Sequence, residues 1–189
     1  MESNLITSRR SVRRYKDEVV SKEVVTQVIE QVRFAPSWGN TQVARYTIVT
    51  DETVIAKLAD NCVKGFVYNV KMLQKAKNVC VLSYVQGKSG VFDGEKAKLM
   101  GLDEAGYVTD KGAEWEIFDA GIACQTFCLA AHEVGLGSCV MGVIEAQNIA
   151  EAIDLPEGET VAALITFGYP AEEPKTPRRL SAEEISRFI

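Results

Sequence analysis

The fold is decided by one stretch of the chain, EWEIFDAGIACQTFCLAAHEV, which covers residues 114–134. It predicts a long helix that carries apolar side chains on nearly every face, among them Ile117, Phe118, Ile122, Phe127 and Leu129. Such a helix must be covered by protein on all sides, and a domain of 189 residues has little material for that task. A second copy of the helix would supply the cover, so the stretch also predicts an oligomer.

The elements around this helix follow from shorter patterns. Two apolar runs, residues 79–82 and 161–167, have the length of buried central strands, and residues 46–49 predict a further short strand. Residues 21–33 carry apolar side chains at three- and four-residue spacing behind Ser21, which predicts a capped amphipathic helix. Residues 170–189 predict an extended C-terminal arm, with a last short helix capped by Ser181. Together they predict one α+β domain.

Composition narrows the class of protein. The chain has 26 acidic and 21 basic residues and a net charge of −5, so we do not expect nucleic acid as a partner. It lacks an apolar run of about 18 residues and a signal-peptide pattern, so we do not expect a membrane partner. Five cysteines without CxxC spacing fit reduced thiols in a cytosol, and we expect a cytoplasmic protein.

Few residues offer acid, base or metal chemistry. The single histidine, His132, rules out most metal sites, and its place near the end of the long helix favours a structural role. Cys124 and Cys128 lie one helical turn apart in a buried segment, which favours inert core thiols. Residues 87–110 are rich in glycine and charge, and they are either a mobile insertion over a site or a solvated excursion.

Four motifs remain as candidates for binding. RRSVRRY at residues 9–15 can grip a phosphate, or it is a solvated basic turn. APSWGNTQ at residues 35–42 can recognise the edge of a heterocycle, or its polar residues only form turns. GLGSCVMG at residues 135–142 lets backbone N–H groups approach a ring, or Gly135 simply ends the helix. The fourth is FGYP at residues 167–170 with PKTPRR at residues 174–179, a strand that leads into a cationic arm.

The order of these four motifs resembles the nitroreductase family of FMN-dependent enzymes, and the resemblance spans essentially the whole chain. It implies an α+β three-layer sandwich, with a central mixed or antiparallel sheet flanked by helices. It also implies an intertwined homodimer, in which residues 1–189 form a single FMN-binding domain and the arm from about residue 170 reaches the partner subunit.

The resemblance implies roles for individual residues. Arg9 and Ser11 would bind the FMN phosphate and ribityl chain, joined by Arg178 or Arg179, while Arg13 would lie by the pyrimidine edge and stabilise its charge. The backbone of Gly142 would meet the flavin N5, and the loop from Pro36 would come from the second subunit. The full set of expected cofactor-binding residues is Arg9, Arg10, Ser11, Arg13, Pro36, Ser37, Trp38, Asn40, Gln42, Asn69, Val140, Met141, Gly142, Arg178 and Arg179, without a metal. Whether Lys71 also contacts the flavin stays open.

The implied activity is that of an oxidoreductase. Bound FMN would take hydride from NADH or NADPH and pass it to a nitroaromatic, a quinone or a similar small electrophile by a ping-pong mechanism. Three alternatives stay open: a flavin reductase or dehalogenase on the same scaffold, a protein that stores FMN without turnover, and a structural dimer that binds no cofactor.

Overall fold

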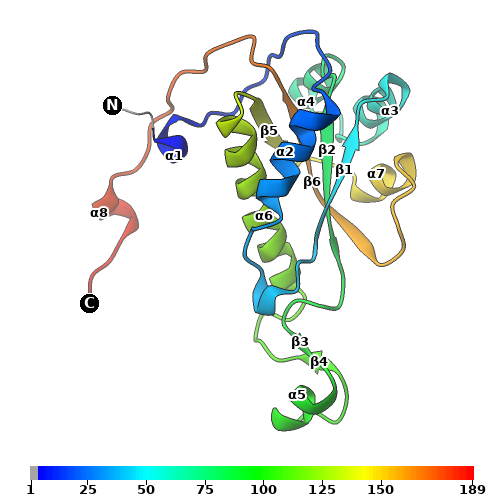
Figure 1. Cartoon of the computed structure of the whole chain (residues 1–189), viewed down its shortest axis with the longest axis vertical. Helices are drawn as coiled ribbons and strands as arrows, with labels where there is room; N and C mark the ends of the chain where they lie inside the picture. The colour runs from blue at the N-terminus through cyan, green and yellow to red at the C-terminus, as the bar shows by residue number, and fades with distance from the viewer. Residues whose placement is uncertain (1–3) are drawn as a thin grey trace.

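The structure is a computed structural model that describes residues 4–189. The helices in chain order are α1 (Leu5–Ser8), α2 (Lys22–Val32), the 3-10 turn η1 (Trp38–Asn40), α3 (Glu52–Asn61), α4 (Val67–Leu73), α5 (Gly94–Leu99), α6 (Glu114–Glu133), α7 (Ala146–Ala152) and α8 (Ala182–Ile185) (Figure 1). The strands are β1 (Ala44–Val49), β2 (Val79–Val85), β3 (Val91–Phe92), β4 (Gly106–Tyr107), β5 (Gly137–Met141) and β6 (Glu159–Gly168).

The main sheet has the order β1-β2-β6-β5, and every neighbouring pair in it is antiparallel. The two strands expected at the centre, β2 and β6, occupy the central positions. Strand β1 lies at one edge and directly follows the loop of residues 36–42. Val79 and Val81 point to one face of the sheet, whereas Cys80 and Leu82 point to the other, so the apolar run of β2 is buried on both sides.

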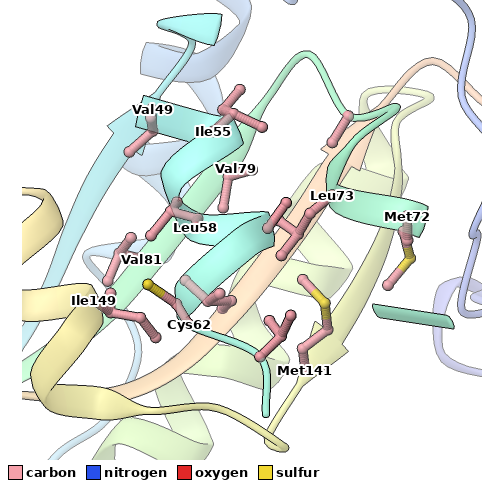
Figure 2. Packing of buried hydrophobic residues seen from close by; sticks show 14 of the residues in the cluster. Val49, Ile55, Leu58, Cys62, Met72, Leu73, Val79, Val81, Met141 and Ile149 are labelled. Carbon is pink, nitrogen blue, oxygen red and sulfur yellow. The ribbon is translucent and has the colours of Figure 1, made fainter. Parts of the chain in front are cut away.

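Helices cover both faces of this sheet, which gives the three layers that the sequence predicted (Figure 1). On one face α3, α4 and α7 pack through residues such as Leu58, Leu73 and Ile149 (Figure 2). On the other face α2 and α6 pack through Val28 and Phe127. The Ser21 hydroxyl accepts the Val24 N–H at 3.4 Å and caps α2 as expected.

The long helix α6 is incompletely covered by its own chain. Phe127 and Ala131 are buried in the core, but Phe118 is 56% exposed and Ile117 is 45% exposed. The expectation that one chain cannot cover this helix is therefore confirmed. No helix in residues 4–189 is long and apolar enough to cross a bilayer.

Two segments extend from this body. Residues 87–110, called the lobe below, fold into the hairpin β3-β4 and helix α5, which the weak periodicity of the sequence did not predict. The C-terminal arm leaves the sheet after β6 and ends in α8, whose capping box joins Ser181 and Glu184 (Figure 1). The arm exposes Leu180, Ile185 and Phe188, so its apolar side chains have no cover within the described part of the chain.

Candidate functional site

The basic N-terminal segment is fixed beside β5. Ser11 forms a parallel bridge with Ser138, and the Val12 N–H donates to the Ser138 carbonyl at 3.0 Å. Val12 lies directly over Gly137, where an added Cβ would come within 2.6 Å of two Val12 side-chain carbons. A glycine is therefore required at position 137, because any side chain would push the segment away from the sheet.

Tyr15 fastens the far end of the same segment. Its hydroxyl donates to the Val12 carbonyl at 2.6 Å and lies 3.0 Å from both the carbonyl and the hydroxyl oxygen of Thr166. Burial raises the pKa of Tyr15, so the phenol stays protonated and keeps this donor. The segment is thus held at Ser11–Val12 and at Tyr15, with Arg13 and Arg14 between these anchors and Arg9 and Arg10 just before the first.

A cleft of about 200 Å³ opens between this segment and the C-terminal arm. The residues that line it are Arg9, Arg10, Ser11, Arg13, Pro174, Lys175, Pro177 and Arg179. The Arg10 guanidinium donates to the Thr176 hydroxyl and ties the two walls together. The Arg9 Nε is buried and has no hydrogen-bond partner among residues 4–189. A buried cationic donor of this kind suits an anion, and guanidinium groups bind phosphate and carboxylate by paired, charge-assisted hydrogen bonds.

The arm contributes differently from the expectation. Both arginines are exposed, but only Arg179 lines the cleft, and the Arg178 carbonyl accepts the Arg179 side chain at 3.3 Å. Lys175, which the expected set leaves out, joins the cleft instead. Glu172 was also missed: its carboxylate accepts the Arg13 N–H at 2.9 Å and forms an ion pair with Arg14 at 3.7 Å.

The end of β5 adds open backbone near the cationic segment. Val140 is 45% exposed, and a Cβ on Gly142 would meet nothing within 4 Å, so the backbone at this strand end is accessible. Met141 points into the core, where it shares a cluster with Met72 of α4 (Figure 2). The same helix carries Asn69, which is buried to 8% exposure. Because the segment at Ser11 runs parallel to β5, the cations and this strand end lie on one edge of the sheet.

The second expected loop, residues 36–42, lies elsewhere. Gly39, Asn40 and Gln42 all have left-handed backbone conformations, with φ of 52°, 59° and 50°. For glutamine this conformation is unfavourable by roughly 1–2 kcal/mol, whereas asparagine tolerates it better, so contacts from outside must hold Gln42 in it. The Trp38 N–H donates to both carboxylate oxygens of Asp119, at 3.1 and 3.0 Å, which fixes the loop at the start of α6.

The two halves of the expected site therefore stand at opposite ends of α6 (Figure 1). Near the end of α6, His132 Nε2 lies 2.8 Å from the Ser8 hydroxyl, next to the cationic segment. Asp119 and His132 are thirteen positions apart, about 20 Å along the helix at 1.5 Å per residue. One chain does not bring the loop and the cationic cleft onto one ligand.

The protonation states of the remaining candidate groups, His132 and Cys128, depend on their neighbours. The pKa of His132 is lowered by burial and by the charges of Arg9 and Arg10, so the neutral form is favoured rather than a cation at the helix end. Cys128 is buried as expected, and the Cys124 thiol beside it lowers its pKa, with help from Ser138. That both thiols are inert stays a prediction.

Comparison with known proteins identifies the family. The sequence model described as "Nitroreductase family" matches residues 6–169. The chain belongs to the nitroreductase family. Within it, the chain is similar to a Bacillus subtilis protein named FMN reductase [NAD(P)H], with 26% identity over 191 residues, 96% of this chain and 70% of the relative.

Solved structures in the nitroreductase family have the same fold. One is named FMN-dependent nitroreductase from Clostridium difficile, with 27% identity, a TM-score of 0.71 and coverage of 97% of this chain and 96% of that chain. Another is described as a nitroreductase in complex with FMN from Desulfovibrio desulfuricans, with 27% identity, a TM-score of 0.74 and coverage of 98% and 95%. The prediction of an α+β nitroreductase-like fold is confirmed.

Proposed function

We propose that the chain is an FMN-dependent oxidoreductase that uses NAD(P)H to reduce a small electrophilic acceptor. The observation that carries the proposal is the cleft between the N-terminal segment and the arm, where the buried Arg9 Nε has no partner among residues 4–189. Relatives named FMN reductase and FMN-dependent nitroreductase support FMN as the group that fits this cleft.

The residues of the cleft fit the phosphate end of FMN. Arg9 offers its orphaned donor, and Arg179 and Lys175 bring two further cations from the arm. Ser11 adds a hydroxyl at the same wall. Guanidinium groups bind phosphate by paired charge-assisted hydrogen bonds, each stronger than a bond between neutral groups. These four residues therefore hold the phosphate and the ribityl chain.

The flavin ring would extend from the cleft along the edge at β5. Arg13 supplies a fixed cation for the pyrimidine end, and the exposed backbone at Gly142 supplies an N–H for N5. When bound, FMN supplies hydride transfer from NAD(P)H to an acceptor such as a nitroaromatic or quinone, in the alternating order of a ping-pong mechanism. The chain itself provides binding, orientation and electrostatics, which is consistent with a single histidine held away from the cleft lining.

Two chains are needed to complete this site. The exposed face of α6 around Phe118 is the surface through which two copies pair, because it is apolar and uncovered in one chain. In an isologous pair with antiparallel helices, the Trp38 end of one α6 meets the His132 end of the other. The loop of residues 36–42 then faces the partner's cleft, and the exposed arm crosses to the partner subunit.

The first experiment is the visible spectrum of the purified protein under anaerobic conditions. We expect flavin bands that bleach on addition of NADPH or NADH and return when a nitroaromatic or a quinone is added. If the protein binds flavin but neither nucleotide bleaches it, the proposed turnover with NAD(P)H is wrong, and FMN storage is the remaining function. A protein that takes up no FMN at all would overturn the proposed function as a whole.

The two-chain site is tested by complementation. Arg9→Ala removes the cationic half of the site, and Trp38→Ala removes the loop half, so each variant is expected to lose most of its turnover. Heterodimers of the two variants, purified through two different tags, contain one intact site of two and should recover about half of the wild-type turnover. Turnover that stays at the level of the single variants would show that both halves act from one chain.

A further inference from the structure

One buried carboxylate joins two parts of the molecule that the cofactor cleft does not touch. Asp119 is 3% exposed, and besides the Trp38 N–H it accepts the Ser89 hydroxyl at 2.6 Å. Ser89 belongs to the lobe and is fully buried. Its hydroxyl also lies 2.8 Å from that of Thr41 in the loop of residues 36–42. The loop, the lobe and α6 therefore meet at Asp119.

Polar contacts hold the loop on the side that faces α2 and β1. A cavity of about 230 Å³ lies between the loop, α2 and β1, and Pro36, Ser37, Gln42 and Asp119 are among its lining residues. Strained left-handed residues in the loop have little apolar support on that side, so the hydrogen bonds to Asp119 must compensate for the strain. Without the Asp119 carboxylate, the Trp38 N–H and the Ser89 hydroxyl would lose their buried acceptor. An unsatisfied buried donor costs more free energy than a hydrogen bond contributes to stability.

The lobe contacts the loop directly as well. The rings of Trp38 and Phe92 lie with centroids 5.2 Å apart at an angle of 50°. A second buried carboxylate, Glu116, accepts the Lys88 N–H at 3.0 Å and the Tyr107 hydroxyl at 3.4 Å. Glu116 thus fastens the lobe to α6 and, within residues 4–189, has no hydrogen bond to the loop, whereas Asp119 fastens both. Both carboxylates are buried on α6 and bind the lobe, and only Asp119 also binds the loop, so Glu116 serves as its matched control.

We propose that Asp119 is a positioning residue that, through Ser89 and the Trp38 backbone, makes the loop of residues 36–42 and the lobe one unit. The setting of the lobe then determines how Trp38 is presented to the partner's flavin site, so nicotinamide and acceptor meet a surface shaped by both segments. This inference rests on the proposed function, although the contacts that carry it exist in the chain without a cofactor.

The first test needs no flavin and uses Trp38 as a reporter in the full chain. The chain has two tryptophans, and Trp115→Phe leaves Trp38 alone; the Trp115 Nε1 has no partner among residues 4–189, so this change breaks no described hydrogen bond. In this background, Asp119→Ala should raise the acrylamide quenching constant of Trp38 about twofold or more, because the loop opens. Glu116→Ala, the matched control, loosens the lobe but keeps the bond from the Trp38 N–H to Asp119, so it should raise that constant clearly less.

The conservative variant separates positioning from simple folding. In Asp119→Asn, the amide oxygen still accepts the Trp38 N–H, and the Ser89 hydroxyl can accept the amide N–H and donate to Thr41. We therefore expect this variant to restore the quenching constant. If Asp119→Ala does not fold, Ser89→Ala removes the link between lobe and loop and should shift quenching in the same direction. Equal effects of Asp119→Ala and Glu116→Ala would overturn the proposal.

The second test uses the FMN-loaded dimer. Asp119→Ala should lower kcat/KM for the acceptor about tenfold or more while FMN affinity falls much less, since the cationic residues Arg9, Lys175 and Arg179 that hold the phosphate are unchanged. Parallel loss of FMN affinity and turnover would indicate a general structural defect and would overturn the positioning role. If the wild-type chain binds no FMN, the proposed function fails, but the quenching test still decides whether Asp119 holds the loop.

Discussion

The close approach of Val12 to Gly137 makes Gly137→Ala a sharp perturbation of the cationic cleft. The new methyl carbon would lie 2.6, 2.6 and 2.9 Å from three Val12 side-chain carbons. Carbon atoms in proteins rest at roughly 3.5–4.0 Å, so Val12 must retreat by about 1 Å. Val12 is held by its bond to Ser138, so the whole segment from Arg9 to Arg13 has to move with it.

Two magnitudes follow from this displacement. Forcing one methyl into a packed contact destabilises a fold by about 1–3 kcal/mol. If the shifted segment loses one charge-assisted hydrogen bond to phosphate, about 1.5–3 kcal/mol of binding free energy is lost. That loss corresponds to a Kd for FMN that is weaker by about 10- to 150-fold. Protein stability should therefore fall moderately, and cofactor affinity should fall more visibly.

The assay is a titration of FMN fluorescence quenching at fixed ionic strength, paired with thermal unfolding of the protein without FMN. Gly106→Ala is the control, because its new Cβ would meet only the Leu102 Cδ1, at an ordinary 3.7 Å. Adding Val12→Ala to Gly137→Ala removes two of the three clashing carbons and leaves only the Val12 Cβ, so it should restore part of the affinity. Unchanged FMN affinity in Gly137→Ala, with no effect of Val12→Ala, would refute the claim that this contact sets the cleft.

Two further predictions concern the charges around the same cleft. His132 should give a single imidazole NMR titration below its usual pKa, and saturating FMN should raise that pKa, because the phosphate offsets the arginine charges. Since the folded-state pKa of His132 is lowered, its contribution to protein stability is full above a pH of about 6.5 and is lost as pH decreases. The variant His132→Gln should therefore lose less stability at low pH. A His132 pKa that does not change when FMN binds would contradict the coupling between His132 and the cleft. Arg179→Ala should weaken FMN binding about tenfold and reduce its salt dependence, whereas the matched Arg178→Ala should bind nearly as the wild type; equal losses would contradict the placement of Arg179 in the cleft.

Most of the fold could be predicted from the sequence, because the apolar residues of its helices and strands recur at regular spacing. The apolar run of β2 and the stripe of α2 behind Ser21 predict strand and helix by local spacing alone. The lobe was not accessible, because β3 and β4 have two residues each and α5 has six, too few for a period to emerge. Its stability depends on Glu116 and Asp119, which lie later in the sequence and read there as ordinary helix residues.

Parts of the site were equally hard to predict. The motif at Arg9 was visible as a cluster of cations and Lys175 as part of the cationic arm, but Glu172 became a candidate only when the arm was seen beside that cluster. The choice between Arg178 and Arg179 depends on the direction of each side chain in an extended arm, and adjacent residues of such an arm alternate in direction. Sequence spacing alone does not decide which of the two faces the cleft.

The length of α6 explains why the proposed site needs two chains. The Trp38 loop is fixed at Asp119 and the cationic segment lies beside His132, about 20 Å away along a rigid helix, so no adjustment of side chains can bring them together in one chain. The same helix is the one whose exposed face, at Ile117 and Phe118, needs a partner for cover. Antiparallel pairing of two copies satisfies both requirements, because it buries the apolar face and places each loop at the other chain's cleft. A change that weakens this pairing should therefore reduce turnover in proportion to the dimer lost, even where the cleft residues are intact.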